Sequence, residues 1–321
     1  MQIIEAVPNI SEAQDYANLA RILGDVRAVL GNVRLLHVDS NADANRTVLT
    51  LAGDPEQVVR VCFMLFRACK TDIDMRFHEG AHPRLGAVDV CPLIPVKDIT
   101  LVETAQFADT LAKCIAKELN IPVYLYEENA RSLARRNLAF IRQGEYESLP
   151  EKLRNLPPDY GPRTFSAEVA HTGASVIGAR NFLIAFNMSL NTQEVKIAQE
   201  IATVLRERNG GLPGVKAIGW YMPGYQCAQV SCNLTDFHKT SLATLFETCK
   251  KEANKRGLQI TGSEMIGLVP QQAILAAGQF YSPDEKNETV LISTATERLL
   301  LNKIQPFVPS ERILEKCLLI Q

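Results

Sequence analysis

Residues 33–52, VRLLHVDSNADANRTVLTLA, decide the fold because they hold two apolar runs on either side of a polar segment. The runs Val33–Val38 and Thr47–Ala52 are rich in β-branched and aliphatic residues, so they predict a pair of strands joined through Asp39–Arg46. Apolar residues recur at helical spacing before this pair, from Tyr16 to Leu30, and again after Asp54. The pair is therefore expected to lie between two helices.

The same order of elements occurs in both halves of the chain. In the first half, strands are expected at 2–7, 33–38, 47–52, 87–96 and 123–126, and helices at 16–30, 54–70 and 102–119. In the second half, strands are expected at 182–188, 215–220, 229–234 and 259–262, and helices at 192–208 and 239–255. Both halves spell βαββαβ, which predicts an α+β fold of two ferredoxin-like subdomains, each an antiparallel sheet with helices on one face. The subdomains are expected at 1–178 and 179–321, linked by a Pro- and Gly-rich connector at 149–178, with a ligand cleft between their sheets.

Bulk composition narrows the class of protein. The chain has 321 residues, of which 46% are hydrophobic and 22% charged, and its formal net charge is −2. This charge, without clustered Lys and Arg, argues against a nucleic-acid partner. The N-terminus lacks the basic and long apolar regions of a signal peptide, and no run is apolar enough to span a membrane. A cytoplasmic protein is expected, and none of the eight cysteines forms a CxxC pair, so they are expected to be reduced and mostly buried.

The most unusual local sequence is HEGAHPRLGAVD at residues 78–89, which lies between a predicted helix and a predicted strand. A histidine that titrates near neutral pH is well suited to proton transfer. His82 precedes Pro83, whose ring restrains the residue before it, and this favours His82 over His78. On the residues alone, the alternative that both histidines only hydrogen-bond the loop stays open. A metal site on these histidines would need a helix, which Gly80 and Pro83 oppose, so no metal is expected.

Two other polar clusters are candidates for substrate contacts. The segment from His37 to Thr47 lies at the ends of two predicted strands, where sites are common. Asp39 could orient a catalytic imidazole, and Arg46 could pair with a carboxylate through two hydrogen bonds; a hydrophilic turn is the alternative. The segment 159–174 combines small residues with an aromatic, which would suit a flat heterocycle, and a plain linker is the alternative. Neither GxGxxG nor a P-loop occurs, so nucleotide binding is unsupported.

In this order, the clusters closely resemble the formiminotransferase domain of formiminotransferase-cyclodeaminase and its stand-alone glutamate formiminotransferase relatives. The matching segments are VPNISE (7–12), NRTV (45–48), HEGAHPRLGAVDVCPLIPV (78–96), PVYLY (122–126), GEYE (144–147), PDYGP (158–162), GARNFLIAFN (178–187), GWY (219–221), AQVS (228–231) and GLVP (267–270). They cover most of the chain, and the HPRLGAVDVCP run is highly specific.

The resemblance implies two ferredoxin-like subdomains, a folate-binding tunnel between them, and a homodimer. It assigns the family's catalytic histidine to His82 and places folate contacts on the Gly-Pro segment at 161–162 and just after it. The substrate- and folate-binding residues predicted in this way are Asn9, Arg46, Arg84, Gly161, Pro162, Thr164, Phe165, His171 and Gly173. Tetrahydrofolate is expected as the carrier substrate. Because the 321 residues contain no counterpart of the family's cyclodeaminase domain, that next step is expected from a separate protein.

The expected reaction is transfer of a formimino group between N5-formiminotetrahydrofolate and L-glutamate, as in histidine degradation. His82 would move the proton, Asp39 would orient it, and Arg46 or Arg84 would bind a substrate carboxylate. No Ser-His-Asp or Cys-His arrangement is apparent, so direct transfer is expected. Asn41-Ala42 replaces the Gly-Pro of animal members, and 166–171 also differs from theirs. Formyl transfer, folate hydrolysis and folate binding without activity therefore stay open.

Overall fold

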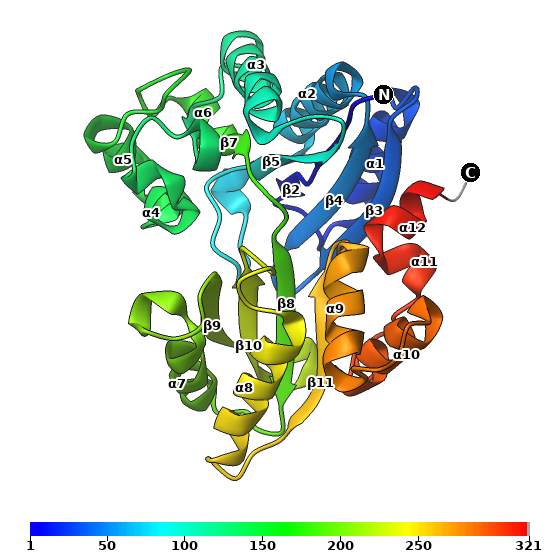
Figure 1. Cartoon of the computed structure of the whole chain (residues 1–321). Coiled ribbons are helices and arrows are strands. Elements are labelled where there is room, and N and C mark those ends of the chain that lie inside the picture. The colour runs from blue at the N-terminus through cyan, green and yellow to red at the C-terminus, as the bar shows by residue number, and fades with distance from the viewer. Residues whose placement is uncertain (320–321) are drawn as a thin grey trace. The chain divides into compact units, whose positions relative to one another are not determined.

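The computed structural model describes residues 1–319 and divides into two compact units, Met1–Asn181 and the residues from Phe182 onward (Figure 1). Each unit has its own sheet, and each has its own apolar core. The expectation of a mixed chain of helices and sheets is confirmed.

The first unit is built on a seven-stranded sheet. Its strands are β1 (Ile3–Ala6), β2 (Asn9–Ile10), β3 (Arg34–Asn41), β4 (Arg46–Gly53), β5 (Val88–Lys97), β6 (Val123–Leu125) and β7 (Ser175–Ala179). Strands β1 and β2 both lie between β4 and β5, and β3 pairs with the outer side of β4; all these pairings are antiparallel. Beyond β5 the sheet continues through β7 to β6, and these two pairings are parallel.

The parallel part of this sheet corrects the prediction. An antiparallel sheet was expected, and 149–178 was interpreted as a connector, but this segment contains α5 (Leu149–Asn155), α6 (Ala167–Thr172) and most of β7. All residues of β7 are buried, and a Cβ at Gly178 would lie 2.2 Å from the carbonyl oxygen of Tyr126. A five-residue buried strand with a glycine in it carries too little periodicity to be recognised.

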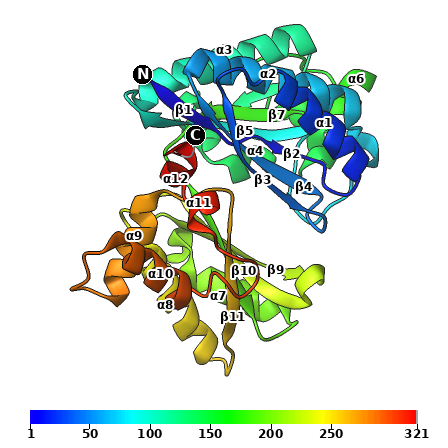
Figure 2. The same ribbon diagram turned by 90° about the vertical axis from the view of Figure 1, so that its right-hand side faces the viewer.

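Helices cover both faces of the first sheet, whereas one face was expected. The long helices α1 (Tyr16–Ala28), α2 (Pro55–Asp72) and α3 (Leu101–Leu119) lie on one face (Figure 2). Their starts are capped by Asp15, Asp54 and Thr100, and Thr100 forms a capping box with Glu103. On the other face, α4 (Leu138–Arg142) and α5 cover the β5–β7–β6 end, where Ile141 and Leu149 join a second apolar cluster. The polar face of β3, β4 and β2 lies outside this second cluster.

The second unit has a four-stranded antiparallel sheet in the order β11-β8-β10-β9. Its elements are β8 (Ile184–Leu190), α7 (Val195–Leu205), β9 (Val215–Met222), β10 (Cys227–Leu234), α8 (Leu242–Asn254), β11 (Ile260–Ile266), α9 (Gln271–Tyr281), α10 (Glu288–Arg298), α11 (Pro309–Arg312) and α12 (Leu314–Leu319). Phe186 in β8 packs against Phe246 in α8, with ring centroids 6.4 Å apart. The order β8-α7-β9-β10-α8-β11 is the predicted βαββαβ order.

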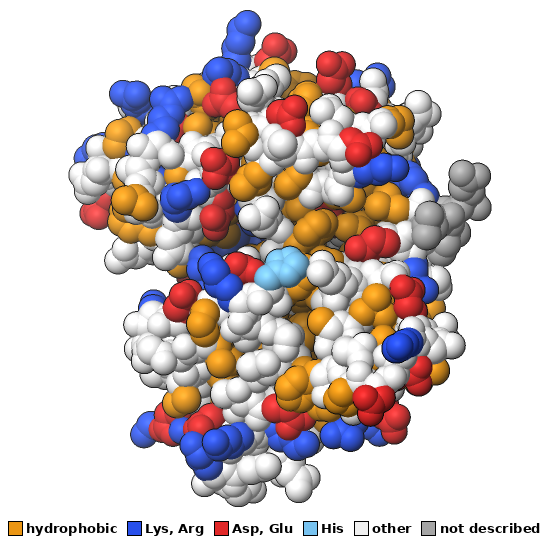
Figure 3. Space-filling model, viewed as in Figure 1, with side chains coloured by type: hydrophobic (Ala, Val, Ile, Leu, Met, Phe, Trp, Pro, Cys, Tyr) orange, Lys and Arg blue, Asp and Glu red, His pale blue; other side chains and the backbone are white. Residues whose placement is uncertain are grey.

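Short 3-10 turns connect several elements, namely η1 (Met75–Phe77), η2 (Glu127–Asn129), η3 (Ala134–Arg136), η4 (Tyr146–Ser148), η5 (Glu207–Asn209) and η6 (Pro223–Tyr225). All eight cysteines are reduced, and Cys114 and Cys227 are the two that are partly exposed. None of the helices in the described residues is long and apolar enough to cross a membrane. On the face shown in Figure 3, Lys and Arg are interspersed with Asp and Glu over both units.

Candidate active site

His82 lies in the loop between η1 and β5 and is half-buried. Its Nδ1 lies 2.8 Å from the carbonyl oxygen of Pro83. A carbonyl oxygen only accepts hydrogen bonds, so in this contact Nδ1 is the donor, and the neutral ring has its basic lone pair on Nε2. The neighbouring proline and this contact together set the tautomer of the imidazole.

Asp89 is the buried centre of the polar network around this loop. Asn9 pairs with Val90 and Ile10 with Val88, so Asp89 is the extra residue of a β-bulge at the start of β5. Bulges re-aim a side chain and are common beside active sites. Its Oδ1 accepts from the backbone N–H of Leu85 at 3.0 Å, which ties the His82 loop to the strand.

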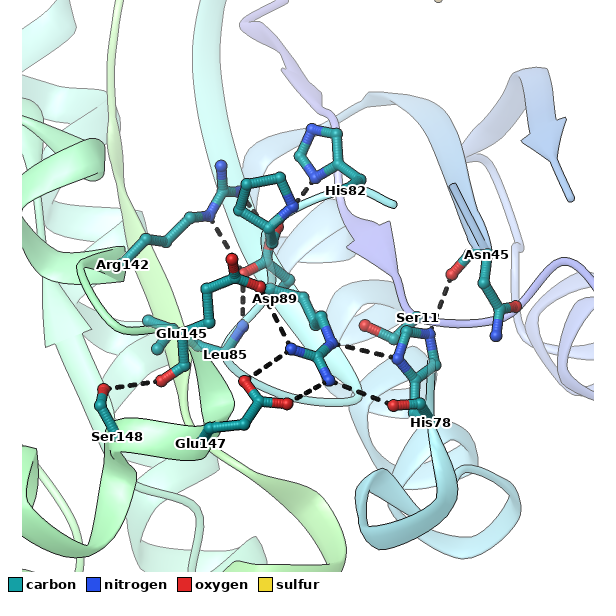
Figure 4. A network of polar contacts seen from close by, with 12 residues as sticks. Ser11, Asn45, His78, His82, Leu85, Asp89, Arg142, Glu145, Glu147 and Ser148 are labelled. Atoms are coloured by element: carbon teal, nitrogen blue, oxygen red, sulfur yellow. Dashed lines mark hydrogen bonds and ion pairs between the residues drawn. The ribbon is translucent and has the colours of Figure 1, made fainter. Parts of the chain in front are cut away.

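Two arginines share the carboxylate of Asp89. Nη1 of Arg46 donates to Oδ2 at 2.7 Å, and Arg142 donates through Nε to Oδ1 at 3.2 Å and through Nη2 to Oδ2. Burial alone would raise the pKa of Asp89, but the two guanidinium groups lower it to about 2. The cluster therefore carries two positive charges and one negative charge. Figure 4 shows Arg142 reaching Asp89 from the far side of the loop, with His82 close by.

The same cluster acts on His82. Burial is the largest cause that lowers the pKa of His82, and the positive charges of Arg46 and Arg142 lower it further. The charge of Asp89 opposes them, and the net pKa lies well below the ordinary value of histidine. The imidazole is therefore neutral at neutral pH and can accept a proton.

His78, the other candidate, is held by the protein through both ring nitrogens. Nε of Arg84 donates to Nδ1 of His78 at 3.2 Å, so Nε2 carries the proton and donates to the carbonyl oxygen of Asn45 at 3.0 Å. These contacts make His78 a link between the loop and the β3–β4 turn (Figure 4).

Arg84 was predicted to bind a substrate carboxylate, but its N–H groups are directed at the protein. Nη1 and Nη2 form a fork on Glu147 at 2.9 and 2.6 Å, and Nη1 also lies 3.2 Å from Glu145. Nη2 donates to the carbonyl oxygen of His78 at 3.1 Å. Every N–H of the guanidinium is thus engaged, so the contacts favour a positioning role for Arg84, and binding of a substrate carboxylate stays a prediction. A pocket of about 400 Å³ lies beside it, lined by Glu79, Gly80, Arg84, Gly144, Glu145 and Glu147.

Asn9 and Asp39 lie on the sheet face opposite the three long helices. Both pair with Val48, so their side chains share a face. Asn9 accepts from Nε of Arg46 at 3.0 Å, which joins it to the cluster around Asp89. Asp39 lies 3.7 Å from Nε2 of His37, and the carboxylate that acts on the pKa of His82 is Asp89. The orienting role of Asp39 stays a prediction.

The predicted folate segment at 161–165 is mostly exposed, whereas His171 and Gly173 contact the protein. Phe165 is 39% exposed and lies edge-on to Tyr146, with ring centroids 6.4 Å apart. His171 lies 2.9 Å from the carbonyl oxygen of Lys70 and 3.2 Å from Asp74. The roles of Gly161, Pro162, Thr164, Phe165, His171 and Gly173 as ligand contacts stay predictions.

Two glycines of this cluster allow close approach of backbones. A Cβ at Gly173 would lie 2.3 Å from the carbonyl oxygen of Leu85, and one at Gly161 would lie 2.5 Å from that of Ile121. Gly173 also forms an isolated bridge with Gly86. The bridge attaches the end of α6 to the loop that carries His82.

Asp89 and Arg142 are the residues that the sequence reasoning missed. Asp89 is the last residue of the unusual run at 78–89, and Arg142 lies just before the GEYE segment. Both positions were within reach of the motifs, but 53 residues separate them. No pattern in the sequence indicates that they meet.

A second polar network lies on the face of the second unit's sheet opposite α7 and α8. Gln229 donates to Ser189 at 3.0 Å and to Glu264 at 3.2 Å, and it accepts from Trp220 at 3.1 Å. Tyr225 also donates to Glu264 at 3.0 Å. Glu264 is 7% exposed and receives its contacts from neutral donors. The sequence reasoning assigned no role to these side chains.

A neutral histidine with a fixed tautomer beside a buried Arg–Asp–Arg cluster is the equipment of an acid–base catalyst, and here it stands on an α/β scaffold of two units. Comparison with known proteins gives the family. The sequence profile described as "Formiminotransferase domain, N-terminal subdomain" matches residues 3–180, and that described as "Formiminotransferase domain" matches 185–319. The chain belongs to the formiminotransferase family.

Curated relatives agree with this assignment. The chain is 43% identical to formimidoyltransferase-cyclodeaminase of Rattus norvegicus over 98% of its own length and 59% of that protein. It is 41% identical to glutamate formimidoyltransferase of Streptococcus pyogenes serotype M1, over 87% of its own length and 93% of that protein. The corresponding enzyme of Thermoplasma acidophilum is 38% identical over 88% and 92% of the two chains. The chain thus spans little more than half the length of the fused relatives and most of the length of the single-function ones.

Proposed function

We propose that this chain is a glutamate formimidoyltransferase, which transfers a formimino group between N5-formiminotetrahydrofolate and L-glutamate. The observation that carries the proposal is a neutral His82 with its basic nitrogen fixed at Nε2, in a chain that matches a glutamate formimidoyltransferase over 93% of that protein. Tetrahydrofolate is the carrier substrate in this proposal, and no metal takes part.

His82 serves as general base and then as general acid. Nε2 takes a proton from the ammonium group of glutamate, and the free amine attacks the formimino carbon, forming a C–N bond while the imine nitrogen takes up the second amine proton. The bond between that carbon and N5 then breaks as the imidazolium returns its proton to N5. The products are formiminoglutamate and tetrahydrofolate, and His82 is neutral again. Acid–base catalysis of this kind contributes roughly 10²- to 10⁴-fold, and holding the two substrates together supplies much of the rest.

The remaining expectations extend the same proposal. Each unit is a ferredoxin-like subdomain, which the strand orders β3-β4-β1/β2-β5 and β11-β8-β10-β9 support. The folate tunnel between the subdomains, the homodimer and the cytoplasmic location belong to the proposal as well. The fused relatives named formimidoyltransferase-cyclodeaminase support a separate cyclodeaminase as the partner that uses the product.

Product analysis tests the proposal. Purified protein is incubated with N5-formimino- or N5-formyl-tetrahydrofolate, with and without L-glutamate, and the products are separated by mass. Formiminoglutamate that forms only with the formimino donor and glutamate together is the expected result. Formylglutamate as the main product would move the assignment to a formyltransferase, release of the group without glutamate would indicate a hydrolase, and folate binding without any product would overturn enzymatic function.

A further inference from the structure

The cluster around Asp89 has more positive than negative charge. Arg46 and Arg142 are both paired with this single carboxylate, and their side chains are 9% and 14% exposed. Burial lowers the pKa of Arg46 to about 10, so it still carries its charge at neutral pH. A buried positive charge without a counter-ion is costly. Such a surplus is well suited to an anion that arrives from outside the protein.

Both guanidinium groups also have a nitrogen that no protein group uses. Arg46 donates through Nε to Asn9 and through Nη1 to Asp89, and Arg142 donates to Asp89 through Nε and Nη2. Within residues 1–319, neither Nη2 of Arg46 nor Nη1 of Arg142 has a hydrogen-bond acceptor. Neither nitrogen is sealed from solvent, because the fully shielded unpaired side-chain atoms in this range are those of Thr50 and Ser175.

We propose that Arg46 and Arg142, held side by side by Asp89, bind the α-carboxylate of the acceptor amino acid. This inference rests on the proposed function. Planar guanidinium groups recognise carboxylates through directed, charge-assisted hydrogen bonds. Arg84, the other candidate for this role, has all its N–H groups engaged by His78, Glu145 and Glu147.

The position of the cluster beside His82 selects which carboxylate binds. The α-carboxylate of glutamate is attached to the carbon that bears the amine, so a cluster next to the proton acceptor places the amine at the imidazole. The carboxylates of the folate tail are separated from N5 by an aminobenzoyl group and lie farther from the reacting atoms. The chemistry shared by both sources is a carboxylate, and the experiment below separates them.

Occupancy of this site would also change the base. The positive charges of Arg46 and Arg142 contribute to the low pKa of His82. A bound carboxylate balances the surplus charge, so it raises the pKa of His82 and makes the imidazole a stronger base when the acceptor is present. Proton transfer is thereby coupled to the arrival of glutamate.

The test uses the full-length Arg142→Gln variant, because Arg46 and Asp89 then remain as a balanced pair. The KM for L-glutamate is expected to rise roughly 10- to 100-fold, while the KM for the folate donor stays within about twofold. γ-Aminobutyrate keeps the amine and lacks the α-carboxylate. It should be a much poorer acceptor than glutamate for the wild type, and this preference should shrink by a similar factor in the variant. Arg142→Lys should restore part of the glutamate affinity, because it returns the charge without the fork.

Arg256→Gln is the matched control, since Arg256 pairs with Glu252 and Glu200 in the second unit. It should leave the KM for glutamate unchanged, and circular dichroism should show that both variants fold. An equal rise in KM for glutamate and γ-aminobutyrate in Arg142→Gln would overturn the assignment. A rise confined to the folate donor would place the folate tail at this site instead.

Equilibrium binding separates failure of this inference from failure of the proposed function. L-Glutamate is titrated calorimetrically into protein saturated with tetrahydrofolate, a complex in which no group can transfer. Binding by the wild type that is lost in Arg142→Gln and kept in Arg256→Gln supports the site even if turnover is absent. Unchanged binding by Arg142→Gln, or no binding by the wild type, rejects it, whatever the transferase assay shows.

Discussion

At the scale of single residues, the site depends on the protonation state of His82. Burial and the positive charges of Arg46 and Arg142 lower its pKa in the folded protein below the ordinary value of about 6.5. The base form is therefore present throughout the neutral range, and it is lost only when the pH falls through the depressed pKa.

The acidic limb of kcat/KM is therefore expected below pH 6.5. In Arg142→Gln one positive charge is removed, so the pKa of His82 should rise and the limb should move to higher pH. A pH–rate profile of both proteins from about pH 4.5 to 9 checks the direction. A limb that moves to lower pH in the variant would contradict the electrostatic account.

The same shift predicts how stability depends on pH. His82 binds a proton more readily in the unfolded chain, so its contribution to folding is complete above about pH 6.5 and is lost as the pH falls towards its folded pKa. Asp89 has a pKa lowered to about 2, so its contribution is present above the ordinary range of a carboxyl and is lost as the pH falls towards that value. Both effects destabilise the protein in acid.

Asp89→Asn should be strongly destabilising, because it leaves two buried guanidinium groups without their shared counter-ion. We expect a loss of about 3–5 kcal/mol in the free energy of unfolding, measured by urea denaturation at pH 7. Asp236→Asn is the control, since Asp236 forms a partly exposed pair with Lys239, and it should cost about 1 kcal/mol or less. Equal losses in the two variants would show that Asp89 does not have this structural role.

At the scale of elements, the loop with His82 depends on a close approach of backbones at Gly173. This residue has φ of 68° and ψ of −153°, a region that glycine almost alone adopts. A Cβ there would also lie 2.3 Å from the carbonyl oxygen of Leu85.

Gly173→Ala is therefore expected to destabilise the protein and to displace the loop, so that kcat falls together with the melting temperature. Gly210→Ala separates backbone strain from collision, because Gly210 has φ of 82° and no atom within 4 Å of an added Cβ. That control should cost only about 1–2 kcal/mol and leave kcat unchanged. A Gly173→Ala enzyme with wild-type kcat would show that the bridge to Gly86 does not position His82.

The elements that could be predicted from the sequence are the long ones with a clear period. The strand pair around 33–52 appears as β3 and β4, and the helix expected at 102–119 is α3, Leu101–Leu119. Helices α4, α5 and α6 have five to seven residues each, which is too short for a helical period to stand out. For the same reason β7 was missed, and with it the parallel part of the first sheet.

The candidate site was predictable where its residues stand in recognisable motifs. His82, Arg46 and Asn9 belong to such segments, and the structure brings Asn9 and Arg46 together with the charge cluster beside His82. The role of Asp89 was not predictable, because it depends on a bulge and on Arg142, far away in sequence. Interactions between distant residues leave no local pattern, so they need the structure.

At the scale of the whole molecule, the two units have separate apolar cores. Phe246 is 1% exposed and belongs to the core of the second unit. Phe246→Ala should cost about 3–5 kcal/mol, and faster amide hydrogen exchange should be concentrated in residues 182–319. Acceleration of the same size throughout residues 1–181 would show that the two units unfold as one.

The central claim is that an uncharged imidazole at position 82 carries the proton during transfer of a formimino group to glutamate. The most direct test is the rate of formiminoglutamate formation by His82→Gln at saturating substrates, with tetrahydrofolate affinity measured on the same protein. The account predicts that kcat falls roughly 10²- to 10⁴-fold while folate affinity stays within about threefold. Wild-type turnover by this variant would contradict it.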